Sequence, residues 1–306
     1  MNSVDLSTRL GPIKLKNPVL SASGTCGYGL ELQPFLDLGE LGAVISKAIT
    51  IEPRTGNRPP RICETASGML NSIGLENIGL SAFIEHILPQ WQRIDTTLIV
   101  NVAGKSEAEY VEVAKGLNGQ AKISALEVNI SCPNVREGGI AFGTDPAMAA
   151  SLIRRVREVS DYPLIAKLTP NVTDIVAIAE SVMEAGADAI SLINTLKGMA
   201  IDLKTRKPAL ATVTGGLSGP AIKPVALRMV HEVYQALKVP ILGGGGIMSG
   251  KDAAEFIICG ASAVSVGTSL FRDPGVLLKI RDGLASYLED NGLSAMEQLC
   301  GSIDLS

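Results

Sequence analysis

The sequence is poor in histidine and has no pair of closely spaced cysteines. Only His86 and His231 supply imidazoles among 306 residues, and both lie in segments with a helical spacing of apolar residues, where a solvated helix face is the ordinary role. The five cysteines are an odd number and widely separated, with no Cys-x-x-Cys pair. This composition disfavours a Ser-His or Cys-His nucleophile, a disulfide framework, a zinc site and an iron–sulfur cluster held by this chain alone.

Long apolar runs and an excess of basic residues are also missing. No apolar stretch approaches the roughly 20 residues that a transmembrane helix needs. The N-terminal residues show no basic segment followed by an apolar one, so we expect no secretory signal and a cytoplasmic protein. The net charge of -4 provides no broad basic surface for a nucleic-acid backbone. We therefore expect neither a membrane nor a nucleic acid as a partner.

The sequence repeats one rhythm, in which a short apolar run ends in polar residues or glycine and an amphipathic helical stretch follows. Strands buried on both faces need such near-continuous apolar runs, and strand–helix alternation predicts parallel pairing through helical crossovers. The eight runs are 18–22, 43–46, 97–100, 125–130, 163–166, 188–193, 239–242 and 262–266. Helical stretches are 107–117, 146–159, 173–184, 221–237, 250–259 and 275–289. We predict an α/β fold, a closed (β/α)8 barrel formed by one domain over residues 1–306. A doubly wound open sheet is the alternative.

Three segments stand outside this rhythm. Residues 6–10 and 13–16, joined by Gly11-Pro12, predict a small N-terminal β-hairpin that caps one end of the domain. The insertions 54–80 and 195–219 are rich in glycine and polar residues, and loops of that length inside a compact domain are usually functional. Both follow strand C-terminal ends, which is the face where a barrel of this kind carries its active site.

Polar residues or glycines close the predicted strands. In strand order they are Ser23, Lys47, Asn101, Asn129, Lys167, Asn194, Gly245 and Gly267-Thr268. If the barrel closes, these groups converge on one pocket. The segment 129–134, Asn-Ile-Ser-Cys-Pro-Asn, adds the thiol of Cys132, and we interpret it as the active site. The alternative is that Cys132 is a small buried hydrophobic residue, as most free cysteines are.

The glycine turns predict an anion site. Gly243 to Gly246 and Gly267-Thr268 let backbone N–H groups approach an anion closely, and the helix beginning near Ser249 adds positive dipole character. Loops after strands seven and eight are the usual phosphate site of this fold. The alternative is a pair of tight turns without a ligand.

Lys167 ends an otherwise apolar strand and needs an anionic or strongly polar partner. A reduced flavin ring would be such a partner, and a structural ion pair with Glu127 is the alternative. One phosphate site, several amides and a lysine together fit flavin mononucleotide (FMN). Direct dinucleotide binding is disfavoured because no Gly-x-Gly-x-x-Gly loop follows the first strand.

Taken together, these motifs resemble class 1 dihydroorotate dehydrogenases over essentially the whole chain. The resemblance is carried by 129–134, Lys47, 71–75, 167–170, Asn194-Thr195 and 243–247. Residues 21–29, the loop 138–143 and residues 214–220 look most like subclass 1B.

This resemblance implies oxidation of (S)-dihydroorotate to orotate in pyrimidine (UMP) biosynthesis. Cys132 would be the catalytic base that takes the C5 proton, while the C6 hydride passes to N5 of FMN. The substrate would be held by Lys47, Asn71, Ser72, Ile73, Gly74, Leu75, Asn129, Asn194 and Thr195. FMN would be contacted by Ser23, Lys47, Ala48, Asn101, Asn129, Lys167, Ile193, Gly219, Gly245, Gly246, Gly267 and Thr268.

Subclass 1B also implies a partner. This would be an iron–sulfur flavoprotein subunit carrying FAD and a [2Fe–2S] cluster, in a heterotetramer of two catalytic and two electron-transfer subunits, with NAD+ as the final acceptor. The glycines of the loop 138–144 make it a candidate for a mobile lid over the substrate.

The sequence alone leaves other functions open. The nearest is a subclass 1A-like enzyme with the same barrel and flavin, which uses fumarate and no partner. A flavin-free lyase or isomerase would use the glycine turns for a substrate phosphate and Lys167 as a Schiff-base amine. In a non-catalytic scaffold, Cys132 would merely be packed. A membrane, quinone-linked enzyme is disfavoured by the missing N-terminal hydrophobic extension and by Cys132, where that class resembles a serine.

Overall fold

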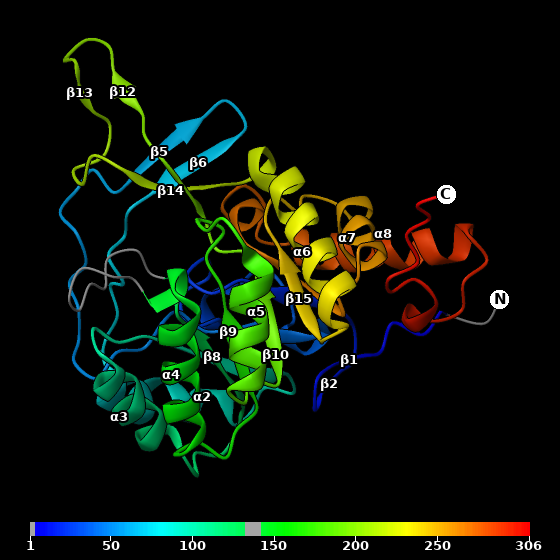
Figure 1. Ribbon diagram of the computed structural model, residues 1–306, viewed down its shortest axis with the longest axis horizontal. Coiled ribbons are helices and arrows are strands. Elements are labelled where there is room, and N and C mark those ends of the chain that lie inside the picture. The colour runs from blue at the N-terminus through cyan, green and yellow to red at the C-terminus, as the bar shows by residue number, and fades with distance from the viewer. Residues whose placement is uncertain (1–3, 132–141) are drawn as a thin grey trace.

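The computed structural model describes residues 4–131 and 142–306, in which eight parallel strands close into a barrel (Figure 1). The barrel strands are β3 (Val19–Ser21), β4 (Ala43–Ile45), β7 (Thr97–Val102), β8 (Ile123–Asn129), β9 (Leu164–Lys167), β10 (Ala189–Leu192), β15 (Ile241–Gly244) and β16 (Ala263–Val266). They neighbour one another in chain order, and β16 pairs with β3 to close the ring. Each strand overlaps one predicted run, so the (β/α)8 barrel is confirmed and the open sheet is wrong.

Helices cover the outside of the barrel. The long ones are α3 (Glu107–Leu117), α4 (Pro146–Arg157), α5 (Ile175–Glu184), α6 (Lys223–Leu237), α7 (Gly250–Ile258) and α8 (Val276–Asp290), and they confirm the predicted helical stretches. The helices α3, α4, α5 and α7 each begin after a Ser or Asp whose side chain accepts a hydrogen bond from the first turn. In the described parts of the chain, every helix is too short or too polar to cross a lipid bilayer.

The first two crossovers depart from this pattern. They contain 3₁₀ turns at Leu30–Leu32 and Leu38–Glu40 in the first, and α1 (Leu80–Ala82), a π-helical turn (Phe83–Ile87) and α2 (Leu88–Trp91) in the second. The first cannot continue as an α-helix because Gly27 and Gly29 have positive φ and Pro34 follows. The indole N–H of the buried Trp91 donates to the Tyr28 carbonyl at 3.2 Å, which ties the two crossovers together.

The N-terminal hairpin closes one end of the barrel. Strands β1 (Thr8–Leu10) and β2 (Ile13–Leu15) pair antiparallel. The side chains of Leu10, Ile13 and Leu15 are buried in one cluster with the inward-facing aliphatic residues of the barrel. The Thr8 hydroxyl also donates to the Ser262 carbonyl at 3.0 Å, just before β16. The predicted cap is therefore confirmed, and it covers the end at which the barrel strands begin.

The two long insertions pair with each other, which corrects the prediction of two loops. A four-stranded antiparallel sheet has the order β11 (Leu196–Gly198), β14 (Gly215–Ser218), β6 (Gly68–Asn71), β5 (Ile62–Thr65), and Figure 1 shows it projecting from one end of the barrel. A further hairpin, β12 (Ile201–Asp202) with β13 (Lys207–Pro208), extends beyond it. The strands of the four-stranded sheet are short, and three of them, β6, β11 and β14, contain glycine. They form because each insertion supplies the other with a pairing edge and not because of local β-propensity.

Replacing Leu10 by alanine should lower the free energy of unfolding by about 2–5 kcal/mol. The side chain is fully buried between hairpin and barrel, so its removal leaves a cavity that a closed ring of strands cannot refill. Urea unfolding followed by tryptophan fluorescence measures the loss. In the same hairpin, the exposed Lys14→Ala is the control, with an expected change within about 0.5 kcal/mol. Equal effects for the two variants would contradict a plugging role for the hairpin.

Candidate active site

The barrel interior is aliphatic near the strand starts and polar near the strand ends. Ile99 on β7 and Ala125 on β8 face inward and belong to the apolar interior cluster. Two residues further along, the same faces carry Asn101 and Glu127, because side chains alternate along a strand. Lys167 ends β9 two residues after an inward-facing isoleucine. The pattern produces a polar layer that rests on an aliphatic one.

Asn101, Glu127 and Lys167 form one hydrogen-bonded group in this layer. The Asn101 amide donates to Glu127 Oε1 at 2.5 Å, and Lys167 Nζ donates to the same oxygen at 3.1 Å. The Glu127 side chain is fully buried and that of Lys167 is 11% exposed. Among the described residues, Glu127 Oε2 and Asn101 Oδ1 are buried without a hydrogen-bond partner. The ion pair considered as an alternative for Lys167 is therefore present, but the group around it is only partly satisfied.

A second polar group lies beside the first. The Ser131 hydroxyl donates to Asn129 Oδ1 at 2.6 Å and accepts a hydrogen bond from the Asn194 amide. Asn129 pairs in register with Lys167 on the next strand, so the two groups adjoin. Ser131 belongs to the predicted active-site segment, but the sequence alone does not indicate its role. Its two-residue spacing from Asn129 is the signal that could have found it.

Cys132, the predicted catalytic base, lies outside the described residues, as does most of the loop 138–144 interpreted as a lid. The buried Ser131 immediately before it belongs to the polar group just described. Three cysteines elsewhere are poor candidates for a thiolate base. Burial raises the pKa of Cys26 to about 11, and burial also raises the pKa of Cys259 and of Cys300.

The predicted substrate-binding segment 71–75 begins at the last residue of β6 and is held by two asparagines that sequence reasoning missed. The Asn57 amide donates to both the carbonyl and the hydroxyl of Ser72, at 3.0 Å each. The buried Asn77 donates to the Leu75 carbonyl at 2.8 Å. Both asparagines act on backbone or on neighbouring side chains, so no local motif in the sequence marks them.

The two insertions bring further predicted substrate residues together. Gly216 on β14 lies opposite Asn71 in the sheet register. A Cβ at Gly216 would collide with the Thr195 hydroxyl. Asn71 and Thr195 therefore flank one glycine, although four of the eight barrel strands lie between them in sequence.

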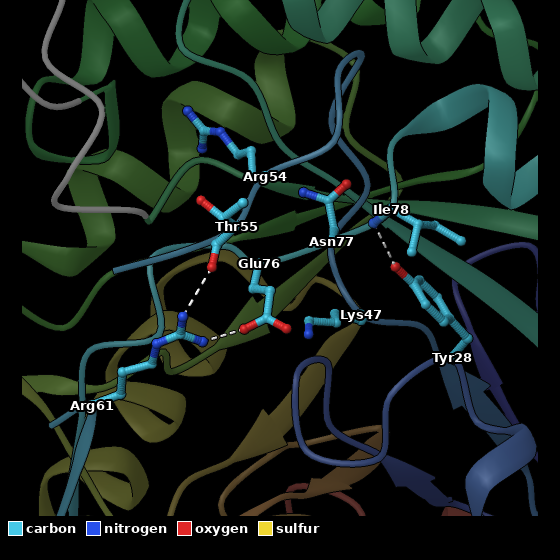
Figure 2. Close-up of a pocket in the computed structure, with 8 residues that line it drawn as sticks. All are labelled: Tyr28, Lys47, Arg54, Thr55, Arg61, Glu76, Asn77 and Ile78. Atoms are coloured by element: carbon cyan, nitrogen blue, oxygen red, sulfur yellow. Dashed lines mark hydrogen bonds and ion pairs between the residues drawn. The ribbon is translucent and has the colours of Figure 1, made fainter. Parts of the chain in front are cut away.

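A cavity of about 550 Å³ opens beside Lys47 (Figure 2). Its lining residues are Tyr28, Lys47, Arg54, Thr55, Arg61, Glu76, Asn77 and Ile78. Figure 2 shows Arg61 reaching the Glu76 carboxylate and the Thr55 carbonyl. Lys47 and Arg54 form no ion pair with any described residue, so the wall keeps an excess of positive charge. Such a cavity suits an anionic ligand, a carboxylate in particular.

The glycine turns after β15 and β16 meet the end of β14. Gly246 has a φ of +85°, and a Cβ there would lie 2.8 Å from the Gly219 carbonyl oxygen. A Cβ at Gly219 would in turn lie 3.6 Å from Thr268 Cγ2. In the described backbone, neither the Gly246 N–H nor the Gly267 N–H donates a loop or turn hydrogen bond. The two glycine turns predicted to bind a phosphate therefore lie beside Gly219, which was predicted to contact FMN. The backbone at Gly219 and Gly246 is so closely packed that side chains are excluded there.

The remaining predicted cofactor residues occupy the same rim. The Ile193 N–H donates to the Gly244 carbonyl at 3.0 Å. A Cβ at Gly267 would lie 3.4 Å from the Cβ of Ala22, the neighbour of Ser23. Ala48 is buried directly after Lys47. The structure thus brings the described members of the predicted site to the strand C-terminal ends and the sheet beside them.

The helix after the first glycine turn is capped by its own side chains. The Ser249 hydroxyl accepts from the Asp252 N–H at 3.3 Å, and the Asp252 carboxylate accepts from the Met248 N–H at 3.0 Å and pairs with Lys223 at 2.6 Å. Burial raises the pKa of Asp252, but hydrogen bonds from Lys223, Met248 and Ser249 outweigh it and leave the pKa lowered. A carboxylate already occupies the positive end of α7, so we expect an anion at the glycine turn rather than at the helix.

Comparison with known proteins places the chain in a well-populated group. The dihydroorotate dehydrogenase family profile matches residues 5–288. The chain is 53% identical over 305 residues to the dihydroorotate dehydrogenase B (NAD(+)), catalytic subunit, of Geobacter sp. (strain M21), covering 100% of both chains. It is 54% identical to the proteins of the same name from Geotalea uraniireducens (strain Rf4), with 99% of each chain covered, and Geotalea daltonii, with 100% covered.

Replacing Asp252 by asparagine should destabilise the protein at pH 7 by about 1 kcal/mol. The folded-state pKa lies below the ordinary 3.8, so the stabilising contribution is present above that value and is lost as the pH falls through the folded-state pKa. Thermal unfolding of variant and parent between pH 3 and pH 7 should therefore converge in acid. Asp161→Asn, at an exposed loop position, is the control. A difference that persists unchanged at the acid end would contradict this assignment.

Proposed function

The chain belongs to the dihydroorotate dehydrogenase family, and from that premise we propose that it oxidises (S)-dihydroorotate to orotate in pyrimidine biosynthesis, as the catalytic subunit of an NAD+-linked enzyme. The observation that carries the proposal is that three features converge on one rim of the barrel. They are the glycine cradle, which is formed by Gly219 and the two glycine turns, the hydrogen-bonded group around Lys167, and the hydrogen-bonded group around Asn129. Residues 1–306 act as one domain in this proposal, in the cytoplasm, where NAD+ is available as the acceptor.

FMN is the proposed cofactor of this chain. Its phosphate fits the cradle in which a Cβ at Gly246 would collide, and its ring fits a polar layer with unpartnered buried acceptors and a cation at 11% exposure. The residues proposed to hold it are Ser23, Lys47, Ala48, Asn101, Asn129, Lys167, Ile193, Gly219, Gly245, Gly246, Gly267 and Thr268. When bound, FMN supplies the acceptor for the hydride removed from C6 of the substrate.

The chain's own side chains have two tasks in this reaction. The Cys132 thiolate takes the proton from C5 of the substrate. The amides of Asn71, Asn129 and Asn194, with the 72–75 backbone and Thr195, orient the substrate ring so that C5 faces the sulfur. Lys47, beside a cavity with surplus positive charge, neutralises the substrate carboxylate. Loss of a proton from C5 and a hydride from C6 leaves the C5–C6 double bond of orotate.

A partner subunit completes the proposal. It would carry FAD and a [2Fe–2S] cluster, bind in a two-plus-two heterotetramer and pass the electrons to NAD+. The relatives' name, catalytic subunit, supports a second subunit. This chain has no Cys-x-x-Cys pair, so such a cluster needs cysteines from another chain.

The alternatives have less support. The fumarate-linked enzyme would share the site, but the relatives are named for NAD(+). The lyase or isomerase would need Lys167 as a free amine nucleophile, whereas it is engaged by the buried Glu127 carboxylate.

The visible spectrum of the purified chain under anaerobic conditions tests the proposal directly. We expect a flavin absorption band that bleaches when dihydroorotate is added, because reduction removes the oxidised chromophore. Reoxidation by NAD+ should then require the partner subunit, and fumarate should not replace it. A colourless protein would contradict the cofactor, and a band that dihydroorotate leaves unchanged would contradict the substrate.

Replacing Cys132 by serine should slow the bleaching step at neutral pH by about 10²- to 10⁴-fold, because a serine hydroxyl is a much weaker base than a thiolate. Stopped-flow absorbance of the FMN-loaded protein measures this rate, and the unchanged flavin spectrum shows that the cofactor site is intact. Cys259→Ser, at the end of α7, is the control and should bleach at the parent rate. Equal rates for the two variants would remove Cys132 from the mechanism.

A further inference from the structure

Glu127 is the member of the Asn101, Glu127 and Lys167 group to which the proposed function assigns no role. It lies near the C-terminal end of β8, and its side chain is fully buried. We propose that Glu127 is a positioning residue, which holds Asn101 and Lys167 toward the cofactor and offsets part of the Lys167 charge, so that it sets the reduction potential of the bound flavin. The inference rests on the proposed FMN site.

The strand register explains how one carboxylate reaches both neighbours. Asn101 on β7 lies directly opposite Glu127. On the other side, Lys167 lies opposite Asn129, two residues further along β8 than Glu127. Both donors converge on the same atom, Glu127 Oε1, at 2.5 Å and 3.1 Å. A single side chain therefore fixes one residue from each flanking strand.

Stability alone gives no reason for a carboxylate at this position. Burying an ion pair removes both charges from water, and well-packed apolar residues of similar size are often as stable or more stable. Here the arrangement is also incomplete, because Glu127 Oε2 and Asn101 Oδ1 have no hydrogen-bond partner among the described residues. The neighbouring interior residues Ile99 and Ala125 are aliphatic, so an apolar residue would suit the site. Because burying the Glu127 carboxylate costs free energy, we expect this carboxylate to act on the bound ligand.

The signs of the two charges give the direction of the effect. The backbone of Lys167 is level with Asn129 and that of Glu127 is two residues deeper, but the charged atoms lie only 3.1 Å apart. Both charges therefore act on the flavin from the same layer. Lys167 favours the reduced flavin, which carries negative charge, and Glu127 weakens this preference through an aliphatic surrounding that screens little. Removing the Glu127 charge should therefore make the flavin easier to reduce.

The test is the midpoint potential of bound FMN in Glu127→Gln, measured by anaerobic spectroelectrochemical titration without dihydroorotate. Glutamine keeps the shape and can still accept from Asn101, but it cannot offset Lys167. We expect the reduction equilibrium to shift toward reduced FMN by about tenfold, which is about 30 mV upward for a two-electron couple. Glu180→Gln, the same change at an exposed position of α5, is the matched control and should leave the potential unchanged.

Two further variants separate positioning from a merely structural pair. Glu127→Asp keeps the charge, so its potential should remain closer to the parent than that of Glu127→Gln, even if its melting temperature falls. The double variant Glu127→Met with Lys167→Met replaces the pair by apolar side chains and should fold at least as well as the parent, while binding FMN at least tenfold more weakly in fluorescence titrations of the apoprotein. It also provides the test if Glu127→Gln does not fold.

The outcomes are distinct from those of the proposed function. Parent protein that binds FMN but is not bleached by dihydroorotate would overturn the substrate and leave the Glu127 measurement valid. Parent protein that binds no FMN would overturn both. A Glu127→Gln potential equal to that of the parent would overturn the positioning role and leave the proposed function standing. A double variant with parental FMN affinity would overturn the positioning role and would also remove Lys167 from the residues proposed to hold FMN.

Discussion

The active-site region depends on one geometric constraint, the two-residue alternation of side chains along the barrel strands. On β7 and β8 the inward face changes from aliphatic to polar within two positions, from Ile99 to Asn101 and from Ala125 to Glu127. A slip of one residue in strand register would turn Glu127 outward against the helices. The ladders between parallel strands therefore hold the polar layer in place, and the loops only add to it.

The hairpin at the opposite end determines the electrical character of that layer. Leu10, Ile13 and Leu15 fill the barrel below the polar residues and exclude water from that side. Charges next to this apolar plug interact through a medium of low dielectric constant. A pair at 3.1 Å, such as Lys167 and Glu127, is therefore coupled far more strongly there than on the surface. The remote N-terminal segment thus contributes to the chemistry of the rim without touching it.

Much of this architecture could be predicted from the sequence, because strands buried on both faces give near-continuous apolar runs and the polar residue at the end of each strand falls at the rim. The β8 run and its closing Asn129 are an example. The insertions were different. Their strands pair over long distances, as Asn71 on β6 does with Gly216 on β14, and each segment alone has the glycine-rich composition of a loop. Nothing local distinguishes a loop from a strand that requires a distant partner.

Some residues that support the site leave a signal in the sequence, and others do not. Asn57 and Asn77 hold the 71–75 segment through backbone contacts, which many residue types in a loop could make, so their role depends on the folded chain. Glu127 did leave a signal, a charge within an apolar run that shares a strand face with Asn129. A structural ion pair and a cofactor-tuning pair impose the same pattern, so the sequence supports both. The unpartnered Oε2 favours the second, because a pair kept for stability alone would have both carboxylate oxygens satisfied.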